Sequence, residues 1–141
     1  MIVIADRMLD ANVLLYSVST LPEEARKRQI ARDLLKRDDF GLSAQVLAEF
    51  YSVATRKQAI KLSPGAALRI VRSLRNRPCV PIDAALVEAG AELSIRYGIS
   101  YWDGAILAAA HRLGAEVLFT EDLNHGQTYG SVRVENPFLN A

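Results

Sequence analysis

The sequence predicts an α/β domain whose central sheet is mainly parallel and has helices on both faces. Short apolar segments alternate along the chain with longer segments that carry apolar residues at helical spacing. Strands that alternate with helices form parallel sheets with right-handed crossover connections. The 141 residues contain no internal repeat and no linker-like stretch, so we expect a single domain over residues 1–141.

The first predicted strand is an apolar run that stops at a carboxylate. Residues 2–5 are apolar, Asp6 and Arg7 interrupt the run, and residues 8–9 resume it before Asp10. In open parallel sheets, ligands bind beyond the carboxyl ends of the strands. Asp10 would lie at such an end, with Asn12 placed to hydrogen-bond to it. Taken alone, Asp10 is explained equally well as the cap of the next helix.

Caps and apolar spacing predict the remaining elements. Helices are expected over residues 13–16, 22–36, 45–57, 63–77 and 84–97, and from Ser100 or Trp102 through Ala110, closed near Gly114. In helix 22–36 we expect the basic residues outside and Ala25, Ile30, Ala31, Leu34 and Leu35 inside. Further strands are expected over residues 40–43, 80–82, 117–119 and 132–134, with a loop between the last two.

Composition excludes several kinds of site. The net charge is +1, although basic residues gather in runs 26–37 and 69–77, and a solvated helix face is the default explanation of such runs. The single Cys79 excludes an internal disulfide and a multi-cysteine metal site, and we expect it buried in a strand. We expect no signal peptide and no membrane-spanning run, and therefore a cytoplasmic protein.

Two acidic residues lie in unexpected places within predicted helices. Glu49 has Val46 and Val53 on its own face, so it borders the apolar stripe of helix 45–57. Such a glutamate needs a partner, a cation or a raised pKa, unless its carboxylate reaches solvent. Asp103 stands in the first turn of a very apolar helix, near the expected strand ends, where the helix dipole also favours it. We interpret its neighbours Tyr101 and Trp102 as packing residues rather than as a platform for stacking bases.

A third acid repeats the pattern of Asp10. Asp122 follows the apolar strand 117–119, and Thr120, two residues earlier, would share its face. Glu121 competes for the same role because adjacent strand residues face opposite ways and the register is open. His125, just beyond, is interpreted as a loop histidine with a structural hydrogen bond.

One parallel sheet would bring Asp10, Glu49, Asp103 and Asp122 to one edge. Carboxylates at close range repel unless some are protonated or a cation neutralises them. A site of oxygen donors without Cys or His suits Mg²⁺ or Mn²⁺, ions that favour phosphate substrates. Such an ion activates water and stabilises charge at phosphorus, which predicts metal-dependent phosphodiester hydrolysis.

The acidic segments also resemble those of PIN-domain nucleases, in particular the VapC-type toxins of bacterial toxin–antitoxin pairs. The likeness covers nearly the whole chain in the right order and rests on residues 9–13, 48–50, 101–106, 120–123, 124–127 and 133–138. The resemblance implies a three-layer α/β/α fold, Mg²⁺- or Mn²⁺-dependent cleavage of RNA that leaves 5′-phosphate ends, a homodimer, and a small antitoxin partner.

The resemblance also implies roles for individual residues. Asp10, Glu49, Asp103 and Asp122 match the family's acidic metal ligands, with Glu121 as the open alternative to Asp122. Asn12 matches the polar residue that supports the first aspartate, and Thr120 matches the hydroxyl residue before the last acid. Our own prediction is that the basic helices at 26–37 or 69–77 contribute the RNA-facing surface, with Arg69 and Arg72 as candidate contacts.

Three other functions fit parts of the pattern. A receiver-like phosphotransfer module would need a lysine after a late strand, yet no lysine follows Lys61. A phosphatase of the haloacid dehalogenase type would need an acid where Asn12 stands. A catalytically silent RNA-binding module that keeps the acidic pocket stays open, and failure to bind Mn²⁺ would favour it.

Overall fold

The computed structural model describes residues 4–141 and contains one six-stranded sheet with strand order β3-β2-β1-β4-β6-β5. The predicted residues 2 and 3 of the first apolar run lie outside the described residues, and the strand itself begins only at Arg7. The strands are β1 (Arg7–Leu9), β2 (Phe40–Ser43), β3 (Cys79–Val80), β4 (Val117–Phe119), β5 (Thr128–Tyr129) and β6 (Val132–Glu135).

The sheet is parallel except at one edge, as the alternation of strands and helices predicts. β1 pairs in parallel with β2 and β4, and β4 pairs in parallel with β6. Only β5 runs antiparallel, because it forms a hairpin with β6 around Gly130, whose φ is +62°. The sequence predicts a loop where β5 lies, since a strand of two residues has no detectable periodicity.

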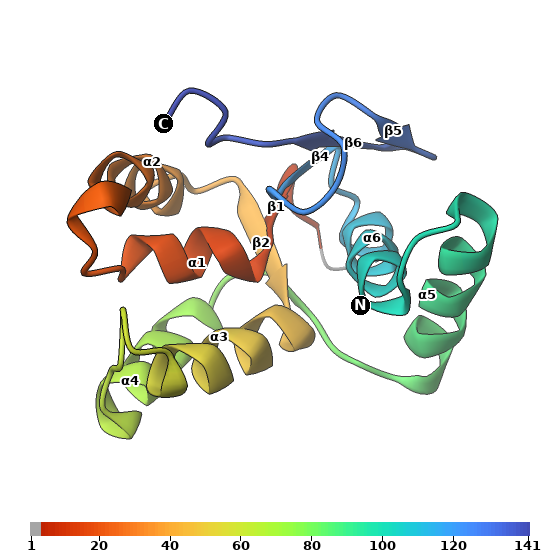
Figure 1. Ribbon diagram of the computed structural model, residues 1–141. Helices are drawn as coiled ribbons and strands as arrows, with labels where there is room; N and C mark the ends of the chain where they lie inside the picture. Colours follow the sequence, from red (N-terminus) through yellow and green to blue (C-terminus); the bar gives the residue numbers. More distant parts are fainter. Residues whose placement is uncertain (1–3) are drawn as a thin grey trace.

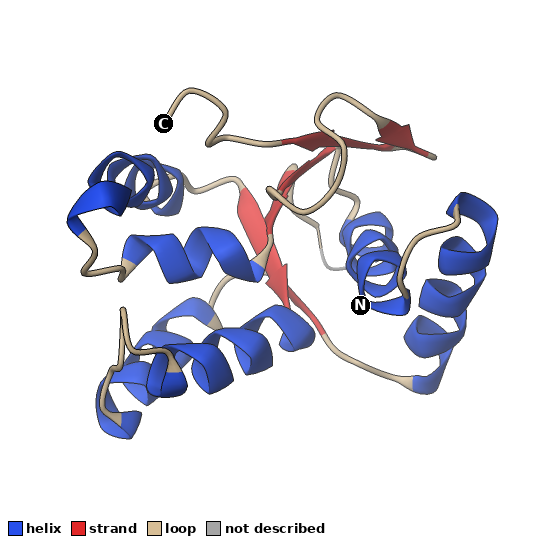
Figure 2. Cartoon of the chain, viewed as in Figure 1, coloured by secondary structure: helices blue, strands red, loops and turns tan. Residues whose placement is uncertain are grey.

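Helices cover both faces of the sheet, which confirms the three-layer α/β/α prediction. Figure 1 shows α1 to α4 on one side and α5 and α6 on the other, and Figure 2 shows the sheet between these two helical layers. The elements are α1 (Ala11–Ser17), the short 3-10 turn η1 (Pro22–Glu24), α2 (Ala25–Leu35), α3 (Ala44–Arg56), α4 (Pro64–Leu74), α5 (Ala84–Tyr97) and α6 (Tyr101–Leu113).

The connections change direction between β1 and β4. The chain moves outward from β1 through β2 to β3 by way of α1 to α4, then returns through α5 and α6 to β4 on the other side of β1. A doubly wound sheet has its ligand crevice outside the carboxyl ends of the strands at such a reversal. The fold therefore places this crevice immediately after Leu9 and Phe119.

The core is centred on α6, which contacts β1, β2, β3, β4 and β6. Residues 104–110 of α6 are all buried, as the continuous apolar run predicts. Ser100 caps this helix and Gly114, with φ +78°, ends it. The predicted caps Ser63, Asp83 and Gly98 are likewise confirmed, so local capping chemistry sets most helix ends.

Three details of the predicted burial are wrong. Ala25 is exposed, because the chain enters α2 from η1 and turns the first residue of the helix outward. Lys27 and Arg28 on the same helix are half-buried rather than outside, since Lys27 lies over the Tyr16 ring and Arg28 donates to the Ser19 carbonyl. Cys79 is half-buried, because β3 lies at the edge of the sheet.

No helix within residues 4–141 combines the length and the apolar character needed to cross a bilayer.

Candidate active site

The predicted acids meet in one cleft at the reversal point of the sheet. The cleft has a volume of about 420 Å³ and is lined by Asp10, Gln45, Ala48, Glu49, Trp102, Asp103, Ile106 and Asp122. Asp10 follows β1, Asp122 follows β4, Glu49 lies in α3 and Asp103 lies in the first turn of α6. Side chains separated by more than a hundred positions in the chain thus face one another.

Asp10 is both the cap of α1 and part of the cleft, so its two interpretations from the sequence hold together. One carboxylate oxygen accepts from the Ala11 amide at 2.7 Å, and the other accepts from the Thr120 hydroxyl at 2.8 Å. Burial raises the pKa of Asp10 to about 7; the two hydrogen bonds oppose this rise, and the charges of Asp122 and Glu49 add to it.

Thr120 connects the two sides of the cleft through one fully buried hydroxyl group. This hydroxyl donates to Asp10 and accepts from the Asn12 amide at 3.2 Å and from the Asp122 backbone N–H at 3.1 Å. A hydroxyl has one proton to donate and two lone pairs, so its bonding capacity is complete. Thr120 therefore fixes the first acid relative to the last.

Asn12 supports Asp122 as well as Thr120. Its Nδ2 donates to the Asp122 carboxylate at 3.3 Å, while its Oδ1 is buried without a partner among the described residues. The sequence predicts Asn12 beside Asp10; the structure places it one step further on, because Thr120 lies between the two side chains.

The acids at the mouth of the cleft also have perturbed pKa values. Partial burial raises the pKa of Glu49, and the negative charge of Asp122 adds to this shift. Burial likewise raises the pKa of Asp122, which the Asn12 hydrogen bond opposes and which Glu121 and Asp103 reinforce. Like charges thus crowd the cleft, which is the electrostatic condition for binding a cation.

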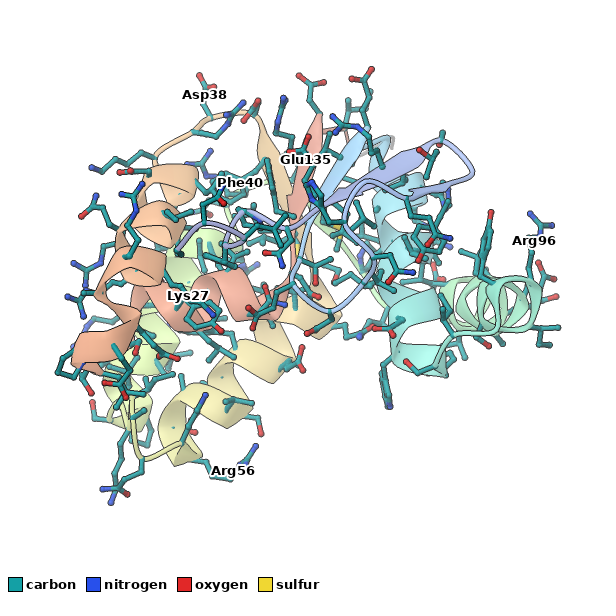
Figure 3. All side chains as sticks on the ribbon, turned by 45° about the horizontal axis from the view of Figure 1, so that its top comes forward. Lys27, Asp38, Phe40, Arg56, Arg96 and Glu135 are labelled. Atoms are coloured by element: carbon teal, nitrogen blue, oxygen red, sulfur yellow. The ribbon has the colours of Figure 1, made fainter. Side chains whose placement is uncertain are left out.

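The side chains of Glu121 and Asp122 have different surroundings in the structure. The Glu121 carboxylate accepts from the Tyr16 hydroxyl at 2.7 Å and lies 3.6 Å from the Lys27 ammonium. Figure 3 labels Lys27, which extends from α2 toward α1. Asp122 lines the cleft and Glu121 does not.

The two predicted arginines lie on α4, away from this cleft. Arg69 and Arg72 are both exposed, and Arg69 lines a second, mainly apolar hollow of about 390 Å³ with residues of α1, α2 and α3. On the other basic helix, Arg28 and Arg32 donate to the backbone carbonyls of Ser19 and Ser17. The exposed Arg69 and Arg72 of run 69–77 are therefore more available to a ligand than Arg28 and Arg32 of run 26–37.

The structure adds Trp102 and Gln45 to the cleft wall. Trp102 is less buried than its interpretation as a packing residue predicts, because 66% of its surface is exposed although its ring contacts the Tyr101 ring. Helical spacing did not reveal this exposure, because Ala105 and Ile106, three and four residues further along the same face, are buried. His125 is a structural residue as expected, since its Nδ1 accepts from the Asn136 amide.

The donor set of the cleft fits a hard divalent cation. Its four acids offer only oxygen, which suits Mg²⁺ or Mn²⁺. Within residues 4–141, no group of three or more acidic, histidine or cysteine side chains forms a preassembled metal cage.

Comparisons with known proteins give the class of the chain. Residues 7–130 match the family model described as the PIN domain, so the chain belongs to the PIN-domain family. No curated protein matches.

Solved structures share the fold at low sequence identity. A toxin–antitoxin complex from Klebsiella pneumoniae has a TM-score of 0.64 and 20% identity, with 93% of this chain and 97% of that chain covered. VapC20 of Mycobacterium tuberculosis, a toxin that cleaves the sarcin-ricin loop, has a TM-score of 0.63 and 19% identity, with 82% and 91% covered. DNA-bound VapBC from Salmonella typhimurium has a TM-score of 0.63 and 21% identity, with 95% and 99% covered.

Proposed function

We propose that this protein is an endoribonuclease that hydrolyses RNA phosphodiester bonds with Mg²⁺ or Mn²⁺. The observation that carries this proposal is the gathering of Asp10, Glu49, Asp103 and Asp122 around one cleft in a chain of the PIN-domain family. The raised pKa of Asp10, which is caused mainly by burial, supports it, because a cation in the cleft would stabilise the charged form of this buried carboxylate.

The four acids divide into ligands of different rigidity. Asp10 and Asp103 would hold the ion most firmly, since Asp10 is buried and doubly hydrogen-bonded and Asp103 stands in the first turn of the central helix. Glu49 and Asp122 would bind directly or through water. The bound ion supplies an activated water and neutralises charge on the phosphate. Thr120 and Asn12 orient Asp10 and Asp122.

Asp122 rather than Glu121 is the fourth acid in this proposal. The Glu121 carboxylate lies outside the cleft, where it accepts a hydrogen bond from the Tyr16 hydroxyl and pairs with the Lys27 ammonium. Glu121 would therefore position the segment that follows β4, while Asp122 faces the ion.

The same proposal includes the role of a toxin in a type II toxin–antitoxin pair. The three structural neighbours are toxins or toxin–antitoxin complexes, two of them assemblies with a partner. The partner here would be a small antitoxin protein, and the nuclease would act as a homodimer in the cytoplasm, where its RNA substrate is. Light scattering on the purified protein tests the dimer.

The decisive experiment is cleavage of a mixed pool of structured RNA with Mg²⁺ or Mn²⁺ against EDTA. We expect cutting that requires the metal and that is lost in Asp103→Asn. Cutting by both proteins would identify a contaminating ribonuclease, since that activity would not depend on Asp103. If neither protein cuts, calorimetry with Mn²⁺ decides: binding points to an RNA absent from the pool, and no binding overturns the proposal in favour of a silent RNA-binding module.

A further inference from the structure

We infer that Trp102 stacks on an unpaired nucleobase of the RNA beside the scissile phosphate, and thereby selects single-stranded segments. This inference rests on the proposed ribonuclease function and assigns a specificity-determining residue to its site. Trp102 is the only tryptophan of the chain.

The position of Trp102 links it directly to the acidic cleft. Its side chain lines the cleft together with Asp103, the next residue in the first turn of α6. Successive helical residues point about 100° apart. A phosphate held near the Asp103 carboxylate would therefore have the indole ring beside it.

The Trp102 indole ring is exposed to solvent and is held by a contact with Tyr101. Two thirds of the Trp102 surface is exposed (66%), although large aromatic residues are normally buried. The Tyr101 ring packs against it edge to face, with ring centroids 5.0 Å apart and an interplanar angle of 72°. This contact restrains the ring and still leaves much of its surface to solvent.

The rest of the cleft wall suits a base better than a second protein surface. Ala48 and Ile106 supply apolar area beside Trp102, while the Gln45 amide offers both donors and acceptors to a base edge. The remaining lining residues are acids, which a phosphate can approach through a cation but an apolar partner helix cannot cover without desolvating charge. Bases in duplex RNA are already stacked and paired, so only unpaired bases could use the indole.

The emission of Trp102 tests the contact without relying on catalysis. The probes are an RNA oligonucleotide with phosphorothioate linkages, which resist cleavage, and the duplex made from the same strand, both with Ca²⁺. We expect the single strand to quench the emission and the duplex to leave it nearly unchanged. Equal quenching by both probes, or none by a single strand that binds, overturns the inference.

Variants measure how much the contact contributes to binding. Stacking on one aromatic residue is typically worth about 1–3 kcal/mol, so Trp102→Leu should weaken single-strand binding about 10-fold, measured by anisotropy of a labelled strand. Trp102→Phe should recover part of this affinity. Ile95→Ala, at an 83% exposed position on α5, is the matched control and should bind normally. Normal binding by Trp102→Leu overturns the inference.

Three further outcomes separate this inference from its alternatives. If the emission shifts to the blue with protein concentration in the absence of RNA, Trp102 is a contact between two copies of the chain and the inference fails. If the wild-type protein cuts RNA with Mg²⁺ while RNA leaves the Trp102 emission unchanged, the proposed function stands and only the stacking is wrong. If the protein neither binds nor cuts RNA, both fail together.

Discussion

A single hydroxyl holds the candidate site together at the scale of residues. Thr120 is fully buried and bridges Asp10, Asn12 and the backbone of Asp122. Groups that orient metal ligands typically affect metal affinity by about 10–100-fold, although they do not touch the ion. The site therefore depends on an uncharged residue as well as on its acids.

Thr120→Val tests this dependence with almost no change in side-chain volume. The valine leaves one Asp10 carboxylate oxygen and the Asp122 backbone N–H without the Thr120 partner, so we expect Mn²⁺ affinity to fall about 10–100-fold and unfolding to become easier by about 1–3 kcal/mol. Calorimetry and urea titration measure the two effects. Thr128→Val, at an exposed position of β5, is the control. Unchanged Mn²⁺ affinity in a folded Thr120→Val protein would contradict the role of Thr120.

Asp10 should make the stability of the metal-free protein depend on pH. Its pKa is 3.8 in the unfolded chain and about 7 in the folded protein, because burial favours the neutral acid. Between these values the folded state binds the proton more tightly, so this group stabilises the fold below pH 3.8 and the contribution is lost as the pH rises to about 7.

Asp10→Asn removes this titration and keeps a good helix cap. In EDTA, the Tm of the variant minus that of the wild type should grow as the pH rises from about 4 to about 7 and level off above. Glu49 and Asp122 titrate in both proteins, so the difference reports Asp10 together with its coupling to their charges. A constant difference for Asp10→Asn would contradict the raised pKa.

At the scale of elements, the close packing of α5 on α6 positions the helix that carries Asp103. The two helices cross at Gly90 and Gly104, where a Cβ on Gly90 would lie 2.9 Å from the Ala105 Cα and one on Gly104 would collide with the Gly90 carbonyl oxygen. Only glycine permits this separation. Because Gly104 follows Asp103 directly, the crossing and the acidic cleft share the first turn of α6.

Gly104→Ala should therefore destabilise the fold by about 1–3 kcal/mol or more, since the obstructing atoms belong to backbone and cannot move aside. Gly65→Ala is an informative control, because no atom lies within 4 Å of the added methyl. That variant should be more stable by about 0.4–1 kcal/mol through lower unfolded-state entropy. Urea titration distinguishes the two signs, and a neutral Gly104→Ala would show that the helices can separate freely.

At the scale of the whole molecule, charge is distributed unevenly despite a net charge of only +1. The negative charge gathers in the cleft, while the exposed Arg69 and Arg72 lie on α4. Three basic residues of α2 already donate hydrogen bonds within the fold, to Ser17, Ser19 and Tyr16. This distribution favours α4 over α2 as the helix that contacts RNA phosphates.

Replacing Arg69 and Arg72 together by glutamine should weaken RNA binding and reduce its salt dependence. The slope of log affinity against log salt should fall by about 1 for each phosphate that the protein no longer neutralises, because fewer counterions are released. Arg96→Gln, at an exposed position of α5 on the other side of the sheet, should leave the slope unchanged. An unchanged slope in the double variant would remove α4 from the RNA-binding surface.

The helices and most strands could be predicted from the sequence because their signals are local. Caps such as Ser63, Asp83 and Gly98 act on neighbouring backbone groups, so they mark helix ends without knowledge of the fold. Strands that end in acids, together with the alternation of strands and helices, were sufficient to predict that Asp10 and Asp122 approach each other. The two-residue strand β5 was not predicted, because it depends on pairing with β6 rather than on its own residues.

The neighbours of each side chain in the site were fixed only by the tertiary structure. Thr120 meets Asp10 across 110 positions of sequence, and Glu121 turns from the cleft because Tyr16 and Lys27 from other elements bind it. The exposure of Trp102 and the closeness of Gly90 to Gly104 likewise depend on how α5 and α6 pack. Such contacts join distant segments, and local propensity carries no information about them, so the details of the site appear only when the sheet has been assembled.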